Sequence, residues 1–83
     1  MDRIFRIAIP TVKEVYAFVE NATKSIAGSA IYAKRDKVVV PCTSIMGMFS
    51  IDPSEPFEVI VPEDKEDSEF IKYISQFSVG EIN

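Results

Sequence analysis

The sequence predicts an α+β domain of two layers, in which three helices cover one face of a four-stranded, mainly antiparallel sheet. Its 83 residues suffice for one domain, residues 1–83, and contain no repeat or linker. Hydrophobic residues make up 47% of the chain, which is typical of a folded protein. Alternating and helical apolar patterns follow one another in the order β, α, β, β, α, β, α, which favours helices packed on a sheet.

The N-terminal part of the chain predicts a strand followed by a helix of about four turns. Residues 3–9 alternate between two faces, with Phe5, Ile7 and Ile9 on one face and Ile4, Arg6 and Ala8 on the other, and Pro10 ends this strand. Thr11 and Glu14 fit a capping box, with Thr11 as the N-cap of the helix and Gly28 as its C-terminal stop. The residues expected to line the buried side of the helix are Val12, Val15, Val19, Ala22 and Ile26.

The middle of the chain predicts a β-hairpin and a short helix. Residues 30–34 and 37–40 are the two strands, with a tight turn at Arg35 and Asp36. Pro41 ends the second strand, and Ser44 lies at or next to the N-cap of a short apolar helix. The two prolines of residues 52–56 predict a loop.

The C-terminal part predicts a fourth strand at residues 57–61 and a last amphipathic helix. The acidic residues 62–67 suit a helix start. Residues 78–83 are expected to form a frayed tail. The apolar residues that follow the helical spacing i, i+3, i+4, i+7 are Phe70, Tyr73, Ile74 and Phe77.

Charge and cysteine content exclude several classes of protein. The net charge of −4 repels nucleic-acid backbones, so we expect no direct nucleic-acid binding. Cys42 is the only cysteine and there is no histidine, which excludes a disulfide and a zinc cluster and favours the reduced cytoplasm. No apolar run resembles a signal peptide or approaches the ~20 residues of a membrane span, so we expect a soluble protein with no membrane contact.

The sequence predicts no catalysis, no cofactor and no metal site. Cys42 has no histidine to act as its base, and the three glycines are too far apart to form a phosphate-binding loop. Four carboxylates cluster near the last helix but lack the spacing of a calcium loop, so we interpret them as a solvated helix start. These residues are Glu63, Asp64, Glu66 and Asp67.

Ser44 is the residue with the clearest chemical potential. One interpretation is purely structural, because a serine at the N-cap satisfies a backbone N–H of the first turn. The other is a phosphorylation site, since the start of a helix favours negative charge. One helical turn cannot bury all of the apolar residues that follow, so an adaptable apolar patch should remain outside as a docking surface. The residues in question are Ile45, Met46, Met48 and Phe49.

Residues 43–51, Thr-Ser-Ile-Met-Gly-Met-Phe-Ser-Ile, resemble the segment around the regulatory serine of HPr-like proteins, the small carriers of the bacterial sugar phosphotransferase system. The order of predicted elements is also the HPr order, so the resemblance spans essentially the whole chain. It implies an open-faced β-sandwich with strand order 1-4-2-3. The chain departs from the family pattern at Thr43, where Lys is usual, at Phe49, where Met is usual, and in the acidic and proline-rich residues 52–56.

The resemblance also implies which functions are lost and which are kept. The phosphohistidine position of the family corresponds to Thr11, so the carrier relay cannot operate in a chain without histidine. In the histidine-less, catabolite-repression type of HPr, HPr kinase/phosphorylase modifies the serine that corresponds to Ser44, and the product acts as corepressor for a LacI-type regulator. The family's partner-binding positions correspond here to Lys13, Ile45, Met46 and Phe49.

Two hypotheses of different kinds follow. The first is a non-catalytic, cytoplasmic HPr-like regulatory protein, phosphorylated on Ser44 and binding a transcriptional or metabolic partner in carbon catabolite control. The second is a diverged interaction module that kept the HPr fold while neither phosphorylation site functions. The second is favoured by Thr43 and by residues 52–56, which remove positive charge around the serine. A working phosphocarrier would need the missing histidine.

Overall fold

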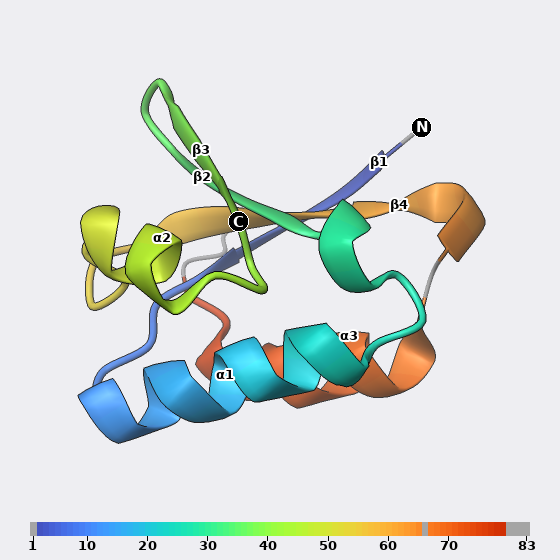
Figure 1. Cartoon of the computed structure of the whole chain (residues 1–83), viewed down its shortest axis with the longest axis horizontal. Helices are drawn as coiled ribbons and strands as arrows, with labels where there is room; N and C mark the ends of the chain where they lie inside the picture. Colours follow the sequence, from blue (N-terminus) through green and yellow to red (C-terminus); the bar gives the residue numbers. More distant parts are fainter. Residues whose placement is uncertain (1, 66, 80–83) are drawn as a thin grey trace.

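The computed structural model describes residues 2–65 and 67–79 and consists of four strands, three α-helices and three short 3-10 helices (Figure 1). The strands are β1 (Asp2–Ile7), β2 (Tyr32–Arg35), β3 (Val38–Pro41) and β4 (Phe57–Pro62). The α-helices are α1 (Val12–Lys24), α2 (Ile45–Ser50) and α3 (Ser68–Ile74). The 3-10 helices are η1 (Gly28–Ala30), η2 (Glu63–Lys65) and η3 (Ser75–Phe77).

The predicted fold class is confirmed. The four strands form one antiparallel sheet in the order β1-β4-β2-β3, which is the HPr-like order that the resemblance implied. Helices α1 and α3 lie side by side along one face of the sheet, while α2 lies at the end of this layer against α1 and β3 (Figure 1). In the described part of the chain, no helix covers the opposite face of the sheet (Figure 1).

The strand register separates the two faces of the sheet. One row across the four strands is buried or half-buried against the helices and consists of Phe5, Val59, Ala33 and Val40. The adjacent row is exposed on the open face and consists of Arg6, Glu58, Lys34 and Val39. This alternation follows from the two-residue period of a strand, and it is what the sequence pattern of β4 encodes.

The core forms between the sheet and the pair α1 and α3. Phe18 of α1 is fully buried at its centre and makes ring contacts with Phe57 of β4 and Phe70 of α3, with centroids 6.3 and 5.9 Å away. Aromatic rings bury large apolar areas and favour edge-on and tilted pairs such as these, so the three side chains help to hold the two layers together. Among the residues that the structure describes, 18 buried hydrophobic residues build the core.

Helix α1 begins as predicted but ends earlier. Thr11 is the N-cap, and its hydroxyl oxygen accepts from the backbone N–H of Glu14 at 3.2 Å. The helix ends at Lys24 rather than near Gly28, so Ile26 falls outside it and is 75% exposed. Val12, in the first turn, is 61% exposed, so its predicted burial was wrong as well. The residues buried on α1 are Val15, Phe18, Val19 and Ala22.

The β2–β3 hairpin lies one residue further along the chain than predicted. Its turn is Asp36 and Lys37, and Arg35 belongs to β2. Asp36 has a φ of 55°, a left-handed conformation that Asp tolerates better than most residues, which places the turn here. The strand begins later than predicted because residues 28–30 form η1.

The C-terminal segment is ordered for longer than predicted. The predicted apolar stripe of α3 and η3 is confirmed, since Phe70, Ile74 and Phe77 are buried. The expectation of a frayed tail was wrong for Ser78 and Val79, because Ser78 bridges to Ile7 and the Val79 N–H donates to the Arg6 carbonyl at 3.1 Å. The rest of the predicted tail, residues 80–83, lies outside the described residues. Within the described chain, no helix is long and apolar enough to cross a bilayer.

Candidate functional site

Ser44 is the N-cap of α2, as predicted. Its backbone is extended, with φ −108° and ψ 116°, and its Oγ accepts a hydrogen bond from the Gly47 N–H at 3.0 Å. A Cβ built on Gly47 would lie 3.2 Å from Ser44 Oγ and 3.1 Å from Val40 Cβ. Glycine therefore lets the first turn of α2 close tightly over both neighbours, and the half-buried serine side chain is held in one place.

Helix α2 presents its methionines in opposite directions. Met48 is fully buried and is the only residue of α2 in the core, whereas Met46 is 84% exposed. Ile45 packs against the core while remaining half-buried, and Phe49 is 38% exposed. The expectation that something apolar on this helix stays outside is therefore confirmed. Positions 46 and 49 share a side of the helix because they are three residues apart.

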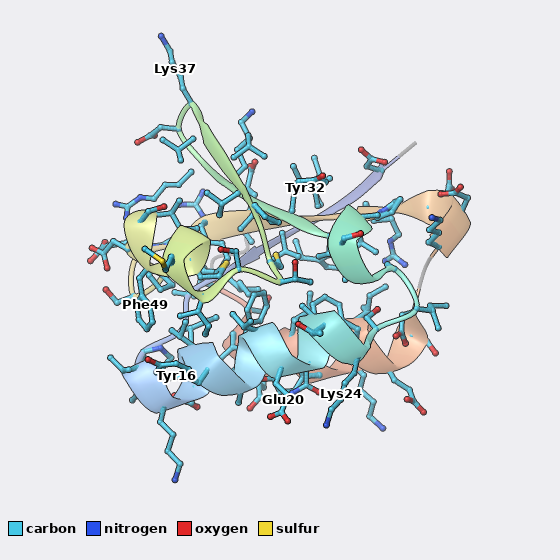
Figure 2. All side chains as sticks on the ribbon, in the orientation of Figure 1. Tyr16, Glu20, Lys24, Tyr32, Lys37 and Phe49 are labelled. Carbon is cyan, nitrogen blue, oxygen red and sulfur yellow. The ribbon has the colours of Figure 1, made fainter. Side chains whose placement is uncertain are left out.

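Two residues of α1 extend this exposed area. The ring of Tyr16 meets the ring of Phe49 edge-on, with centroids 5.8 Å apart, and both face the same side of the molecule (Figure 2). Tyr16 is 54% exposed and Val12 lies one turn before it. We call the area formed by Val12, Tyr16, Met46 and Phe49 the α1–α2 apolar surface. It is contiguous across two elements, which distinguishes it from apolar residues scattered singly on a surface.

A hollow of about 190 Å³ lies at one end of the α1–α2 apolar surface. Its lining includes Val12 and Phe49, with polar groups from Thr11, Asp52 and Ser54. Thr11 is the position that the resemblance to HPr-like proteins predicts as the counterpart of their phosphohistidine. Its hydroxyl donates to Glu14 Oε1 at 2.9 Å while accepting from the Glu14 N–H, so its hydrogen-bonding capacity is used in capping α1.

Lys13 lies beside this surface rather than within it. It is exposed in the first turn of α1, about 60° around the helix from Tyr16 at 100° per residue. In the described part of the chain it makes no ion pair with another residue. Lys13 and the apolar residues of α2 are thus brought to the same region of the molecule, at the two helices that face each other. Their role in partner binding stays a prediction.

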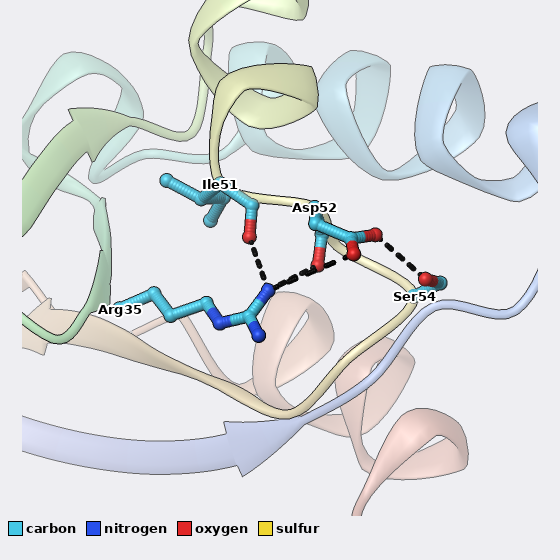
Figure 3. A network of polar contacts seen from close by, with 4 residues as sticks. All are labelled: Arg35, Ile51, Asp52 and Ser54. Atoms are coloured by element: carbon cyan, nitrogen blue, oxygen red, sulfur yellow. Dashed lines mark hydrogen bonds and ion pairs between the residues drawn. The ribbon is translucent and has the colours of Figure 1, made fainter.

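Sequence reasoning missed Tyr16, Val12 and Arg35. Helical spacing predicts burial for Val12 and no role for Tyr16, since it cannot show that α2 lies beside the first turn of α1. Arg35 was placed in a turn, yet its Nη1 donates to the carbonyls of Ile51 and Asp52 at 2.9 and 3.2 Å (Figure 3). The usual sequence signal for a contact with the last carbonyls of a helix is a cation close to the end of that helix. Arg35 instead lies on a strand that precedes α2 in the chain.

Cys42 is buried in the core, and the acidic cluster contributes a helix cap. Cys42 is fully buried just after β3, and burial raises the pKa of its thiol, which keeps it neutral and unreactive at neutral pH. Asp67, from the acidic cluster, caps α3 through its side chain. Within residues 2–65 and 67–79, no three potential ligands gather to hold a metal ion, and Glu66 lies outside these ranges.

Comparison of the chain with models of protein families, with curated proteins and with solved structures found no match.

Proposed function

We propose that this chain is a non-catalytic HPr-like regulatory protein of the cytoplasm, phosphorylated on Ser44 and acting by binding a protein partner in carbon catabolite control. The observation that carries the proposal is the half-buried Ser44 hydroxyl at the start of a helix whose Met46 and Phe49 are exposed. A modifiable group and an adaptable apolar surface thus belong to one short element. The partner would contact Lys13, Ile45, Met46 and Phe49.

Phosphorylation of Ser44 is compatible with the local structure. A phosphoserine keeps an ester oxygen that can accept from the Gly47 N–H, and α2 has no acidic residue in its first turn to repel the new charge. The phosphate would add negative charge directly beside the apolar residues. A partner that recognises both features would bind the modified form better than the unmodified one.

The identities of the enzyme and partner rest on the resemblance of residues 43–51. It points to HPr kinase/phosphorylase as the modifying enzyme and to a LacI-type regulator as the partner. The net charge of −4 supports action on DNA through that regulator rather than by direct contact. The complete absence of histidine supports a role without phosphohistidine transfer, and Thr11, at the lost position, serves as a helix cap.

Incubation with purified HPr kinase/phosphorylase and ATP tests the proposal, with intact-mass spectrometry as the readout. We expect one added phosphate on the wild-type chain and on Ser50→Ala, and none on Ser44→Ala. Ser50 is a matched control, because it is an exposed serine of the same helix whose hydroxyl donates to the Gly47 carbonyl. An unmodified wild-type chain, or phosphate that persists in Ser44→Ala, would contradict the proposal.

A second candidate is a diverged interaction module that binds a partner without phosphorylation. It is favoured by the charge around α2, which carries no cation of its own and is followed by the exposed acids Asp52 and Glu55. A pull-down with the unmodified chain, followed by titration of the captured protein, tests this candidate. Phe49→Asp should abolish binding, whereas Ile26→Asp, at an equally apolar exposed position outside the surface, should not. Binding that is insensitive to Phe49→Asp would contradict it.

A further inference from the structure

The backbone hydrogen bonds at the C-terminal end of α2 are long. A helix leaves its last carbonyls without partners, and the N–H groups just beyond its end often satisfy them. Here Asp52 follows the helix in a left-handed conformation, with φ 53°, and the next residue is Pro53, which has no N–H. The Ile51 N–H donates to the Met48 carbonyl at 3.3 Å and the Asp52 N–H to the Phe49 carbonyl at 3.4 Å, and both distances are long for a hydrogen bond.

Arg35, at the end of β2, adds a side-chain donor for two carbonyls just beyond the helix, of which that of Asp52 also accepts from the Glu55 N–H at 3.1 Å. Its Nη1 donates to the Ile51 carbonyl at 2.9 Å and to the Asp52 carbonyl at 3.2 Å (Figure 3). The same nitrogen lies 3.9 Å from Asp52 Oδ2, and the other carboxylate oxygen, Oδ1, accepts from the Ser54 hydroxyl at 2.7 Å. A cation is favoured at the C-terminal end of a helix, and hydrogen bonds that involve a charged group are the stronger ones.

Helix α2 depends on such contacts from outside. It has six residues, and isolated helices of this length are not stable in water. Met48 is the only buried residue of α2, so packing against the core holds the helix mainly through this one side chain. Ser44 holds the first turn, and Arg35 holds the residues at which the helix ends. The Arg35 side chain is 33% exposed, which shields its contacts partly from solvent.

We propose that Arg35 is the positioning residue of the α1–α2 apolar surface. By holding Ile51 and Asp52, it fixes the orientation of α2 and thereby keeps the Phe49 ring against Tyr16. The hairpin thus determines the shape of a surface to which it contributes no side chain. The significance of this surface for partner binding rests on the proposed function, whereas the positioning itself is a property of the chain alone.

Amide hydrogen exchange followed by NMR tests the positioning directly. In Arg35→Ala we expect the amides of Met48, Phe49 and Ile51 to exchange about tenfold faster, because each lost charged hydrogen bond promotes local opening. Amides of β1 and β4 should change much less, and the ring-current shifts between Tyr16 and Phe49 should shrink. A purely global destabilisation would instead accelerate the most protected amides of every element alike and would overturn the proposal.

Two further variants sharpen the test. Lys34→Ala removes the neighbouring cation, whose side chain is exposed on the open face, and should leave α2 exchange unchanged. Arg35→Lys should give an intermediate rate, because an ammonium group keeps the charge but lacks the long planar guanidinium. Unchanged α2 exchange in Arg35→Ala would also overturn the positioning role.

Phosphorylation kinetics separate this inference from the proposed function. If the kinase modifies the wild-type chain, Arg35→Ala should lower kcat/KM for Ser44 phosphorylation, and Lys34→Ala should not. An unchanged kcat/KM together with faster α2 exchange would support the positioning role of Arg35 and would contradict the importance of this surface for the enzyme. If the wild-type chain is not modified, the proposed function fails, while the exchange rates and ring-current shifts still decide whether Arg35 positions α2.

Discussion

The Ser44 hydroxyl contributes to stability before any modification. Its Oγ accepts from the Gly47 N–H, so Ser44→Ala should lower the free energy of unfolding by about 1 kcal/mol, measured by urea denaturation. Ser44→Asp should retain most of this stability, because a carboxylate at the N-cap accepts the same bond. Ser29→Ala, at an exposed serine of η1, is the control and should have little effect. Equal stability of Ser44→Ala and the wild-type chain would show that the cap is unimportant.

The two methionines of α2 form a natural matched pair for measuring how the helix is anchored. Met48 is fully buried and Met46 is 84% exposed, although they differ by only two positions. Met48→Ala should cost about 2–5 kcal/mol, because it removes buried surface and leaves a cavity. Met46→Ala should change the free energy of unfolding by less than about 0.5 kcal/mol, as substitutions of exposed residues usually do. Similar losses in the two variants would contradict the orientation of α2.

Asp67 links the start of α3 to the end of α1. Its Oδ1 accepts from the N–H groups of Glu69 and Phe70, and its Oδ2 accepts from the Ser25 hydroxyl at 2.9 Å and from the Ile26 N–H at 3.4 Å. The hydrogen bond from Ser25 is the main reason that the Asp67 pKa is lowered from its ordinary value of 3.8, with backbone N–H groups assisting against partial burial.

This lowered pKa gives the stability a defined pH dependence. The ionised carboxylate stabilises the folded state above the ordinary pKa of 3.8, and that contribution disappears as the pH falls through the lower, folded-state pKa. Asp67→Ala should therefore cost about 1–2 kcal/mol at neutral pH, and the difference from the wild-type chain should shrink below pH 3.8. Urea unfolding across this range measures the effect. Glu69→Ala, which removes a nearby exposed acid, should show a smaller loss; equal losses would contradict the link.

Periodicity was enough to predict the type and order of the elements but not their boundaries. Alternation and helical spacing depend on which side of each element is buried, and most of these sides were identified correctly. The hairpin was misplaced by one residue because Asp36 adopts a left-handed conformation without an adjacent glycine. The strand order followed from the resemblance, since no local pattern shows which strands pair.

The candidate site could be predicted only where it lies within one element. Ser44 and its apolar neighbours are contiguous in the sequence, so capping rules and the length of a helical turn were sufficient to identify them. Tyr16 joins the surface through a tertiary ring contact with Phe49, 33 positions away in the printed sequence. Arg35 acts on backbone carbonyls 16 and 17 positions away, which any residue type could provide, so sequence offers no signal for that contact.

At the scale of the whole molecule, an open edge of a sheet is a place where copies of a chain can pair. β3 is a terminal strand, whereas the edge of β1 is bridged by Ser78. The Cys42 N–H donates to the Ile31 carbonyl at 2.9 Å, so the backbone of Cys42 points toward the neighbouring chain segment. Along a strand, the backbone groups of successive residues point alternately toward and away from a given neighbour. The backbone of Pro41 therefore faces away from β2. Proline has no N–H to offer a new strand at this edge, which is a known protection against edge-to-edge pairing.

Removing this protection should promote self-association. Pro41→Val restores an outward N–H to a strand whose Val38 and Val39 are already about half exposed, at 50% and 53%. We expect its weight-average mass in sedimentation equilibrium to rise with protein concentration more steeply than that of the wild-type chain. Pro56→Val, in an exposed loop, tests whether loss of any proline has this effect and should behave like the wild-type chain. If Pro41→Val associates no more than Pro56→Val, the short length of β3 and the charged Lys37 at the hairpin tip (Figure 2) are sufficient to keep the edge unpaired.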